Sequence, residues 1–152
     1  MYDKKAVGLG HRVMRITDFN AVQKFHVFNI RKKVFVFEQN VRAEDEYDQY
    51  EETSNHYIAK IEMKYVGTAR WRFTDEGIKL ERFAVLDAYR NEGIGTLILN
   101  KVLEDVKKEG KKKIYLHAQL PAIKFYERAG FVKEGPQFSE CNIDHYKMVL
   151  KG

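Results

Sequence analysis

The sequence predicts an α/β fold of the α+β type, in which a mixed, mostly antiparallel sheet of six to seven strands is flanked by about four helices. Short apolar or alternating runs recur between turn residues, which is typical of strands. Residues 78–118 read as strand, loop, helix and strand, and such a unit forms a parallel, right-handed crossover. At 152 residues the chain can bury a core of its own, so we expect one domain over residues 1–152.

The first third of the chain is expected to hold one strand and one long helix. The strand covers residues 11–16, and Asp18 provides the N-cap of a helix over about residues 20–37. The apolar positions of this segment are only partly at helical spacing, and residues 34–37 also fit a strand, so both alternatives stay open there. Residues 38–54 are expected to form an acidic loop.

Two further helices and several strands account for the rest of the chain. One helix follows the strand expected at residues 78–85 and ends with Gly110 as its C-cap. The other has Pro121 in its first turn and runs to Ala129, where Gly130 stops it. The remaining strands are expected at residues 56–63, 66–74, 78–85, 114–118, 131–134 and 145–150.

The stretch with the most chemical information is residues 90–95, Arg-Asn-Glu-Gly-Ile-Gly, which joins a strand to an amphipathic helix. The free N–H groups at the start of a helix, at the positive end of its dipole, form a site for phosphate. Glycine lets a ligand approach the backbone closely, and Arg90 adds a positively charged guanidinium with several hydrogen-bond donors. A Walker loop would need a lysine before Thr96, and a dinucleotide fingerprint would need a third glycine where Ile98 stands.

Two motifs in this order resemble the GNAT N-acetyltransferase superfamily. Residues 90–95 resemble its R/Q-x-x-G-x-G/A pyrophosphate loop, and residues 119–131 resemble its N-x-x-A-x-x-F-Y-x-x-x-G-F segment, with Gln119 in place of the usual Asn. This resemblance covers roughly residues 56–150. A closer resemblance, over nearly the whole chain, is to the small bacterial ElaA/YjcF-like branch of that superfamily. The closer resemblance rests on residues 34–41, the acidic segment, residues 116–119 and residues 135–145.

The resemblance implies an acyl-CoA-dependent N-acyltransferase that moves an acetyl group from acetyl-CoA to a primary amine. The amine attacks directly in a ternary complex, without a metal and without a covalent enzyme intermediate. It also implies that strands 78–85 and 114–118 splay apart, with the pantetheine arm of acetyl-CoA between them. The residues expected to bind acetyl-CoA are Phe83, Ala84, Val85, Arg90, Asn91, Glu92, Gly93, Ile94, Gly95, Thr96, Gln119 and Tyr126.

Tyr126 is the candidate catalytic acid. The leaving group of a thioester is a thiolate, and a phenol can protonate it or donate a hydrogen bond to its sulfur. The family carries a tyrosine at this place in its Phe-Tyr pair. The alternative is that Tyr126 only packs with Phe125 and Phe131.

Glu81 is the candidate catalytic base, because an amine that is protonated at neutral pH must lose a proton before it attacks. Alternation places Glu81 on the same strand face as Val85, four residues later. Its alternative is an ion pair with a neighbouring arginine, and many relatives use a water relay instead. His56, His117 and His145 are further candidates for the base. Glu38, Arg70 and His145 are the residues expected to face the acceptor amine.

The net charge of +5 is unevenly placed, because residues 44–52 carry six acids and no base. A basic body suits an anionic co-substrate, and the acidic segment is expected to attract a cationic acceptor. There are two alternatives. One is a non-catalytic acyl-CoA sensor, and the other is a basic module that binds nucleic acid through the basic residues around Trp71. In an alternating strand, however, Trp71 would face the core and its neighbours Arg70 and Arg72 the other side, which makes nucleic acid the weaker alternative.

The compartment and assembly are predicted from what the chain contains. One cysteine, Cys141, permits no internal disulfide and fits a reducing cytosol, so we expect a cytoplasmic protein. No apolar run approaches the length of about 20 residues that spans a bilayer, so no membrane partner is expected. The sequence is compatible with a monomer or a homodimer.

Overall fold

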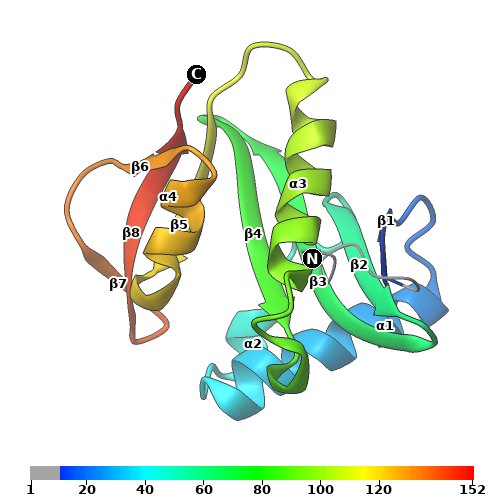
Figure 1. The fold of residues 1–152 in the computed structure, drawn as a ribbon. Helices are drawn as coiled ribbons and strands as arrows, with labels where there is room; N and C mark the ends of the chain where they lie inside the picture. The colour runs from blue at the N-terminus through cyan, green and yellow to red at the C-terminus, as the bar shows by residue number, and fades with distance from the viewer. Residues whose placement is uncertain (1–10) are drawn as a thin grey trace.

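The computed structural model describes residues 11–152, which are organised around one eight-stranded sheet (Figure 1). The strand order is β1-β2-β3-β4-β5-β8-β6, and β7 pairs with β8. Among the described strands only β4 and β5 are parallel, so the predicted mixed, mostly antiparallel sheet is confirmed. The strands are β1 His11–Arg15, β2 Asn55–Ile61, β3 Lys64–Thr74, β4 Gly77–Val85, β5 Ile114–Gln119, β6 Phe131–Lys133, β7 Phe138–Glu140 and β8 Ile143–Leu150.

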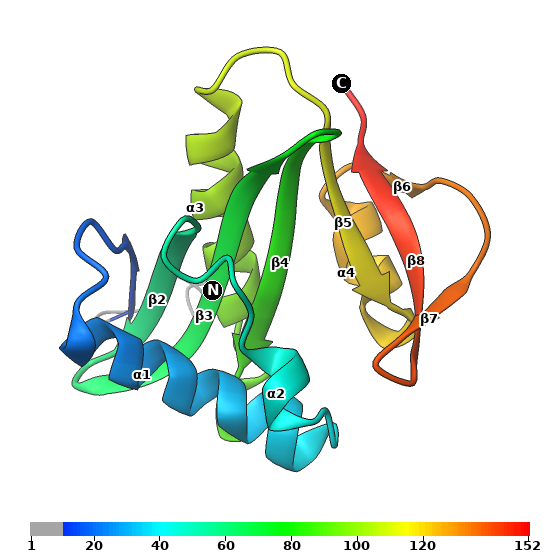
Figure 2. The same cartoon turned by 180° about the vertical axis from the view of Figure 1, so that it is seen from behind.

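Helices cover both faces of this sheet. Helix α1 (Ala21–Arg31) and the short α2 (Ala43–Glu46) lie on one face, and α3 (Ile94–Lys107) and α4 (Ile123–Arg128) lie on the other (Figures 1 and 2). Two apolar clusters fill the layers, one under α3 around Trp71 and the other under α1. Short 3-10 turns, η2 (Asp87–Tyr89) and η3 (Leu120–Ala122), precede α3 and α4. No helix within residues 11–152 is long and apolar enough to cross a membrane.

The predicted bounds of the first helix need correction. Its N-cap is Asn20, whose side chain accepts a hydrogen bond from the Gln23 amide at 3.0 Å, and not Asp18. The segment that also fitted a strand continues α1 as a π-helix, η1 (Lys32–Glu38), because Val34 and Phe35 pack under the sheet from a helical backbone. At the end of α3 the C-cap is Lys108, and Gly110 follows it in a left-handed conformation with φ 94°.

Strands β4 and β5 separate after a short stretch of parallel pairing. Ile78, Lys79 and Leu80 pair with residues 114–116, and from Glu81 onward the β5 side of β4 has no strand partner. Both views show the two strands diverging toward the end of the sheet that carries α2 and β7 (Figures 1 and 2). The splay implied by the family resemblance is therefore present, and it leaves unpaired backbone along the last part of β4.

A β-bulge in β4 overturns the predicted orientation of Glu81. Arg82 has φ +58°, and the register with β3 shifts so that Glu81 pairs with Arg70 while Ala84 pairs with Thr68. The extra residue reverses the alternation of side chains along the strand. Ala84, and with it Glu81, therefore faces the α1 side, whereas Val85 packs toward the α3 cluster. Glu81 and Val85 lie on opposite faces of the sheet, not on the same face.

The acidic segment is a folded layer over the α1 face and not a solvated loop. Arg31 is 1% exposed and donates hydrogen bonds to the carboxylates of Glu46 and Glu51. Arg70 is also 1% exposed, and it donates to Asp48 and Glu51. Half of the acids in the segment are therefore neutralised by arginines from α1 and the sheet. Because these charges are paired, the segment does not present six free carboxylates to an incoming cation.

Candidate active site

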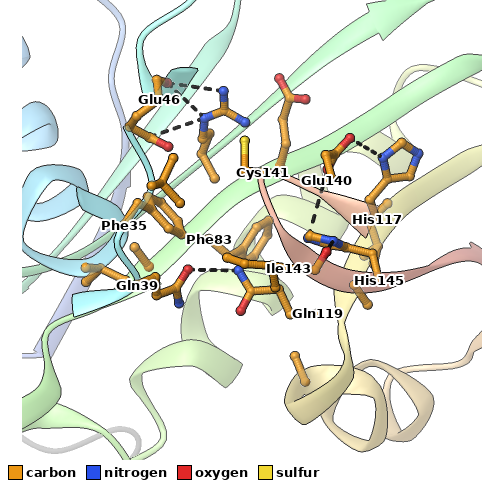
Figure 3. A pocket seen from close by; sticks show the side chains of 18 of the residues that line it. Phe35, Gln39, Glu46, Phe83, His117, Gln119, Glu140, Cys141, Ile143 and His145 are labelled. Carbon is orange, nitrogen blue, oxygen red and sulfur yellow. Dashed lines mark hydrogen bonds and ion pairs between the residues drawn. The ribbon is translucent and has the colours of Figure 1, made fainter. Parts of the chain in front are cut away.

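Two cavities meet between the splayed strands. The first, of about 400 Å³, lies between the end of β4, the start of α3 and α4, and we call it the α3 cavity. The second, of about 480 Å³, lies between β4, η1, β5 and the β7–β8 hairpin, and we call it the β8 cavity (Figure 3). The residues that line both are Phe83, Ala84, Val85, Arg90, Ala122 and Tyr126.

The start of α3 presents unpaired amides to the α3 cavity. Gly93 is the N-cap and has φ 83°, a left-handed conformation that glycine adopts without strain. The first backbone bond of the helix runs from the Leu97 amide to the Gly93 carbonyl. Within residues 11–152, the amides of residues 91–96 donate no hydrogen bond to the protein. This turn therefore has the donors and the dipole that a phosphate group needs.

Arg90 lies at this turn but its guanidinium is already engaged. It donates to both carboxylate oxygens of Glu38, and its Nε donates to the Val85 carbonyl at 2.9 Å. The hydrogen bond from Arg90 holds the pKa of Glu38 below its ordinary value. Of the expected acetyl-CoA ligands, Glu92 lines neither cavity and Gln119 lines only the β8 cavity. Glu38, expected to face the acceptor, lines neither cavity and contacts the site through Arg90.

Tyr126 stands where the two cavities join. Its ring makes edge-on contacts with Phe83, Phe125 and Phe131, so the predicted packing is present. Its hydroxyl has no hydrogen-bond partner among the described residues, and burial raises the pKa of this phenol well above its ordinary value. A phenol with a raised pKa keeps its proton at neutral pH, which is the state that an acid must have.

Glu81 lines the β8 cavity, but its carboxylate is held by three cations. Arg70 Nη2 lies at 2.5 Å, Arg72 Nε at 2.8 Å and Lys79 Nζ at 3.5 Å from its oxygens. Burial would raise the pKa of Glu81, yet the charge of Arg70 and the hydrogen bond from Arg72 outweigh it and leave the pKa lowered. A carboxylate that is paired with three cations and has a lowered pKa is a poor base, so the geometry favours the ion-pair alternative. Arg70 lies behind Glu81 and lines neither cavity.

The opposite wall of the β8 cavity carries a carboxylate between two histidines (Figure 3). His145 on β8 and His117 on β5 lie on either side of Glu140, the last residue of β7. Sequence reasoning missed Glu140 because β7 has only three residues and shows no periodicity. The turn that follows has positive φ at Cys141 and Asn142, as a two-residue hairpin requires, and Asn142 was the one local signal for it.

A hydrogen bond between two amides spans the β8 cavity. Gln119 Nε2, at the end of β5, donates to Gln39 Oε1, at the end of η1, at 2.9 Å. Gln39 was not predicted, because nothing in the sequence connects residues 80 positions apart. Within residues 11–152, no cluster of three His, Cys, Asp or Glu side chains is arranged to hold a metal ion.

Comparisons with known proteins find relatives of this chain in sequence and in fold. Residues 18–151 match the family described as acetyltransferase (GNAT) domain. The uncharacterized N-acetyltransferase YjcF of Bacillus subtilis (strain 168) is 37% identical over 131 residues, which are 86% of this chain and 94% of that protein. The crystal structure of Escherichia coli ElaA has a TM-score of 0.79 at 24% identity and covers 94% of this chain and 100% of its own. An acyl-CoA N-acyltransferase from Pseudomonas aeruginosa has a TM-score of 0.79 at 20% identity, with coverage of 95% and 100%.

Proposed function

The chain belongs to the GNAT acetyltransferase family, and on that premise we propose that it transfers an acetyl group from acetyl-CoA to a primary amine by direct attack in a ternary complex. The observation that carries the proposal is the position of Tyr126. This residue lines both the cavity with unpaired amides and the cavity with titratable side chains, between two splayed strands.

In this proposal acetyl-CoA occupies the α3 cavity. The amides of residues 93–96 hold its pyrophosphate, and the unpaired edge of β4 from Glu81 to Val85 pairs with the pantetheine arm. The thioester then lies near Phe83 and Tyr126, where both cavities meet. Backbone donors of β4 stabilise the oxyanion that forms when the amine attacks from the β8 cavity, and Tyr126 protonates the leaving thiolate.

Thiol release from acetyl-CoA tests the proposal directly. A screen of amines, including benzylamine, amino acids, polyamines, aminoglycosides and peptides, should show release that depends on both the protein and an amine. Calorimetry with acetyl-CoA alone should show binding. Binding without release for any amine would favour the acyl-CoA sensor and refute the transfer.

The nucleic-acid alternative receives no support from the basic residues that suggested it. Arg70 and Trp71 are each 1% exposed, and Arg72 is paired with Glu81. A protein that binds the phosphates of a nucleic acid needs such basic side chains at its surface. A steep dependence of DNA or RNA affinity on salt concentration would restore this alternative.

A further inference from the structure

Three side chains from three strands converge on the wall of the β8 cavity that faces β4. Glu140 on β7, His145 on β8 and His117 on β5 share one face of the sheet by strand register. Glu140 Oε1 lies 3.9 Å from His145 Nε2, and Glu140 Oε2 lies 3.3 Å from His117 Nδ1 (Figure 3). His145 and Glu140 line the same cavity as Tyr126.

The hydrogen bond at the far side of the His145 ring fixes its tautomer. His145 Nδ1 lies 2.7 Å from the carbonyl oxygen of Ile143. A carbonyl only accepts hydrogen bonds, so Nδ1 carries the proton and Nε2 of the neutral ring keeps a lone pair. The ring is 6% exposed and stacks on Phe138, with centroids 5.6 Å apart, so its orientation is held by packing as well.

Glu140 supplies a negative charge beside that lone pair. The hydrogen bond from His117 and its charge lower the pKa of Glu140 to about 2 against the opposing effect of burial. The carboxylate is therefore ionised at any pH at which an enzyme of this kind would work. Lys79 on β4 also contributes to that shift, and Asp144, next to His145 on β8, is exposed to solvent.

We propose that the acceptor binds as an ammonium ion beside Glu140 and gives its proton to His145 Nε2. The proposal rests on the proposed acetyl transfer and assigns its acceptor site. The gap of 3.9 Å between Nε2 and Oε1 is too long for a direct hydrogen bond, and an ammonium group can donate to both atoms at once. The acceptor class is therefore a primary amine that is protonated in solution.

The amine nitrogen loses two protons during the transfer. The ammonium nitrogen gives one proton to His145 Nε2, which later releases it to solvent. The neutral amine forms a bond to the carbonyl carbon of the thioester, and the carbon–sulfur bond then breaks. The sulfur leaves as a thiolate and takes a proton from Tyr126, and the second proton lost by the nitrogen restores the tyrosine. His117 makes no proton transfer; it is a positioning residue that holds Glu140.

The experiment compares two variants with a matched control, using acetyl-CoA and benzylamine. His145→Gln should lower kcat/KM for benzylamine by about 10²-fold or more and leave the KM for acetyl-CoA unchanged. Glu140→Gln should act mainly by raising the KM for benzylamine. Asp144→Asn removes an exposed acid from the same hairpin and should leave every parameter at its wild-type value.

Two further readouts separate this inference from the proposed function and from a structural role. Aniline is neutral at pH 7, so its acetylation should be much less sensitive to His145→Gln than that of benzylamine. Nitrogen NMR of the histidine rings in the acceptor-free protein should show His145 protonated at Nδ1. A proton on Nε2, or unchanged kcat/KM in His145→Gln, would overturn the inference and leave the transfer standing. If the wild-type protein acetylates no amine, the transfer itself fails.

Discussion

Arg90, which lines both cavities, and Glu38, 52 residues away in sequence, form an ion pair in which the guanidinium donates to both carboxylate oxygens. Glu38 is the last residue of η1, and Arg90 precedes the turn with the unpaired amides. The side chains are 32% and 40% exposed, so the pair is of the kind that contributes only about 0–1 kcal/mol. A doubly charged phosphate can therefore compete with Glu38 for the guanidinium.

Substitutions at the two residues should change acetyl-CoA affinity in opposite directions. Arg90→Ala should weaken binding by roughly 1.5–3 kcal/mol, the usual contribution of a hydrogen bond to a charged group. Glu38→Gln should strengthen it by up to about 1 kcal/mol, because the competing carboxylate is removed. Asp87→Asn is the control. Asp87 is 88% exposed, and its carboxylate comes no closer than 3.4 Å to the Arg90 guanidinium, so this contact is weak. Calorimetry checks all three, and unchanged affinity in the first two would remove Arg90 from the site.

A comparison with a second glycine separates the role of Gly93 in binding from the stability cost of placing a side chain on left-handed backbone. Gly93 and Gly135 have φ 83° and 85°, and a Cβ at Gly135 would meet no atom within 4 Å. Alanine at either position should therefore cost about 1–2 kcal/mol of stability. Only Gly93→Ala should also reduce acetyl-CoA affinity, because Gly93 lines the α3 cavity and a methyl group there would obstruct a phosphate that approaches the amides of this turn. Equal affinity in the two variants would contradict the assignment of this turn.

Several features of the site could be predicted from the sequence. The turn at Gly93, the helix after it and the splay after Leu80 followed from motif and resemblance. The orientation of Glu81 did not follow, because it depends on a bulge at Arg82. Arginine has no preference for positive φ, so no residue type announces that bulge. A shift of one residue is enough to exchange the two faces of a strand.

The acidic segment shows a second limit, which concerns charge. A count of acids is the same whether the carboxylates are free or paired. The partners of Glu51 are Arg31 and Arg70, 20 and 19 residues away in sequence, and only the folded chain brings them together. Electrostatic steering of a cationic acceptor by this segment therefore loses its main support, although a cationic acceptor itself remains a prediction.

Tyr126→Phe should lower kcat by about 10²-fold or more and leave the KM for acetyl-CoA nearly unchanged. Phenylalanine keeps the edge-on contacts with Phe83 and Phe131, and the hydroxyl that is lost bonds to no described residue. The fold should therefore be intact, which thermal unfolding checks. Turnover within a few-fold of wild type would identify Tyr126 as a packing residue.

Glu51→Gln should destabilise the fold by about 3–5 kcal/mol, because it removes one partner from a buried group of ions. Its carboxylate accepts from Arg31 at 2.8 Å on both oxygens and from Arg70 at 2.9 Å. Glu44→Gln, at an exposed position of the same segment, should change stability by no more than about 0.5 kcal/mol. Urea unfolding measures both variants, and similar midpoints would mean that the ion cluster is dispensable.

Asp48 provides a test of the same cluster by pH. Burial opposes ionisation, but hydrogen bonds from Arg70 and the charges of Arg70 and Arg82 prevail, and the pKa of Asp48 falls from 3.8 to about 2. A native pKa below the unfolded value means that the unfolded chain binds more protons, so this contribution is complete above pH 4 and is lost as pH falls toward 2. The shift corresponds to a contribution of about 2 kcal/mol to the free energy of unfolding, because each pKa unit is worth about 1.4 kcal/mol. Solvent screens this charge only weakly, because the Asp48 side chain is 23% exposed.

Asp48→Asn should therefore be less stable than the wild-type protein at neutral pH, and the difference should shrink between pH 4 and pH 2. Urea unfolding of both proteins at several pH values measures that difference. The other carboxyl groups are the same in both proteins, so their titration cancels to first order when the two free energies of unfolding are subtracted. Asp45→Asn is the control, because Asp45 pairs with Arg42 at the surface and with no other residue of 11–152. Its stability difference from wild type should be small at every pH. A difference for Asp48→Asn that persists unchanged at pH 2 would show that its cost arises from packing and not from the charge that Arg70 and Arg82 stabilise.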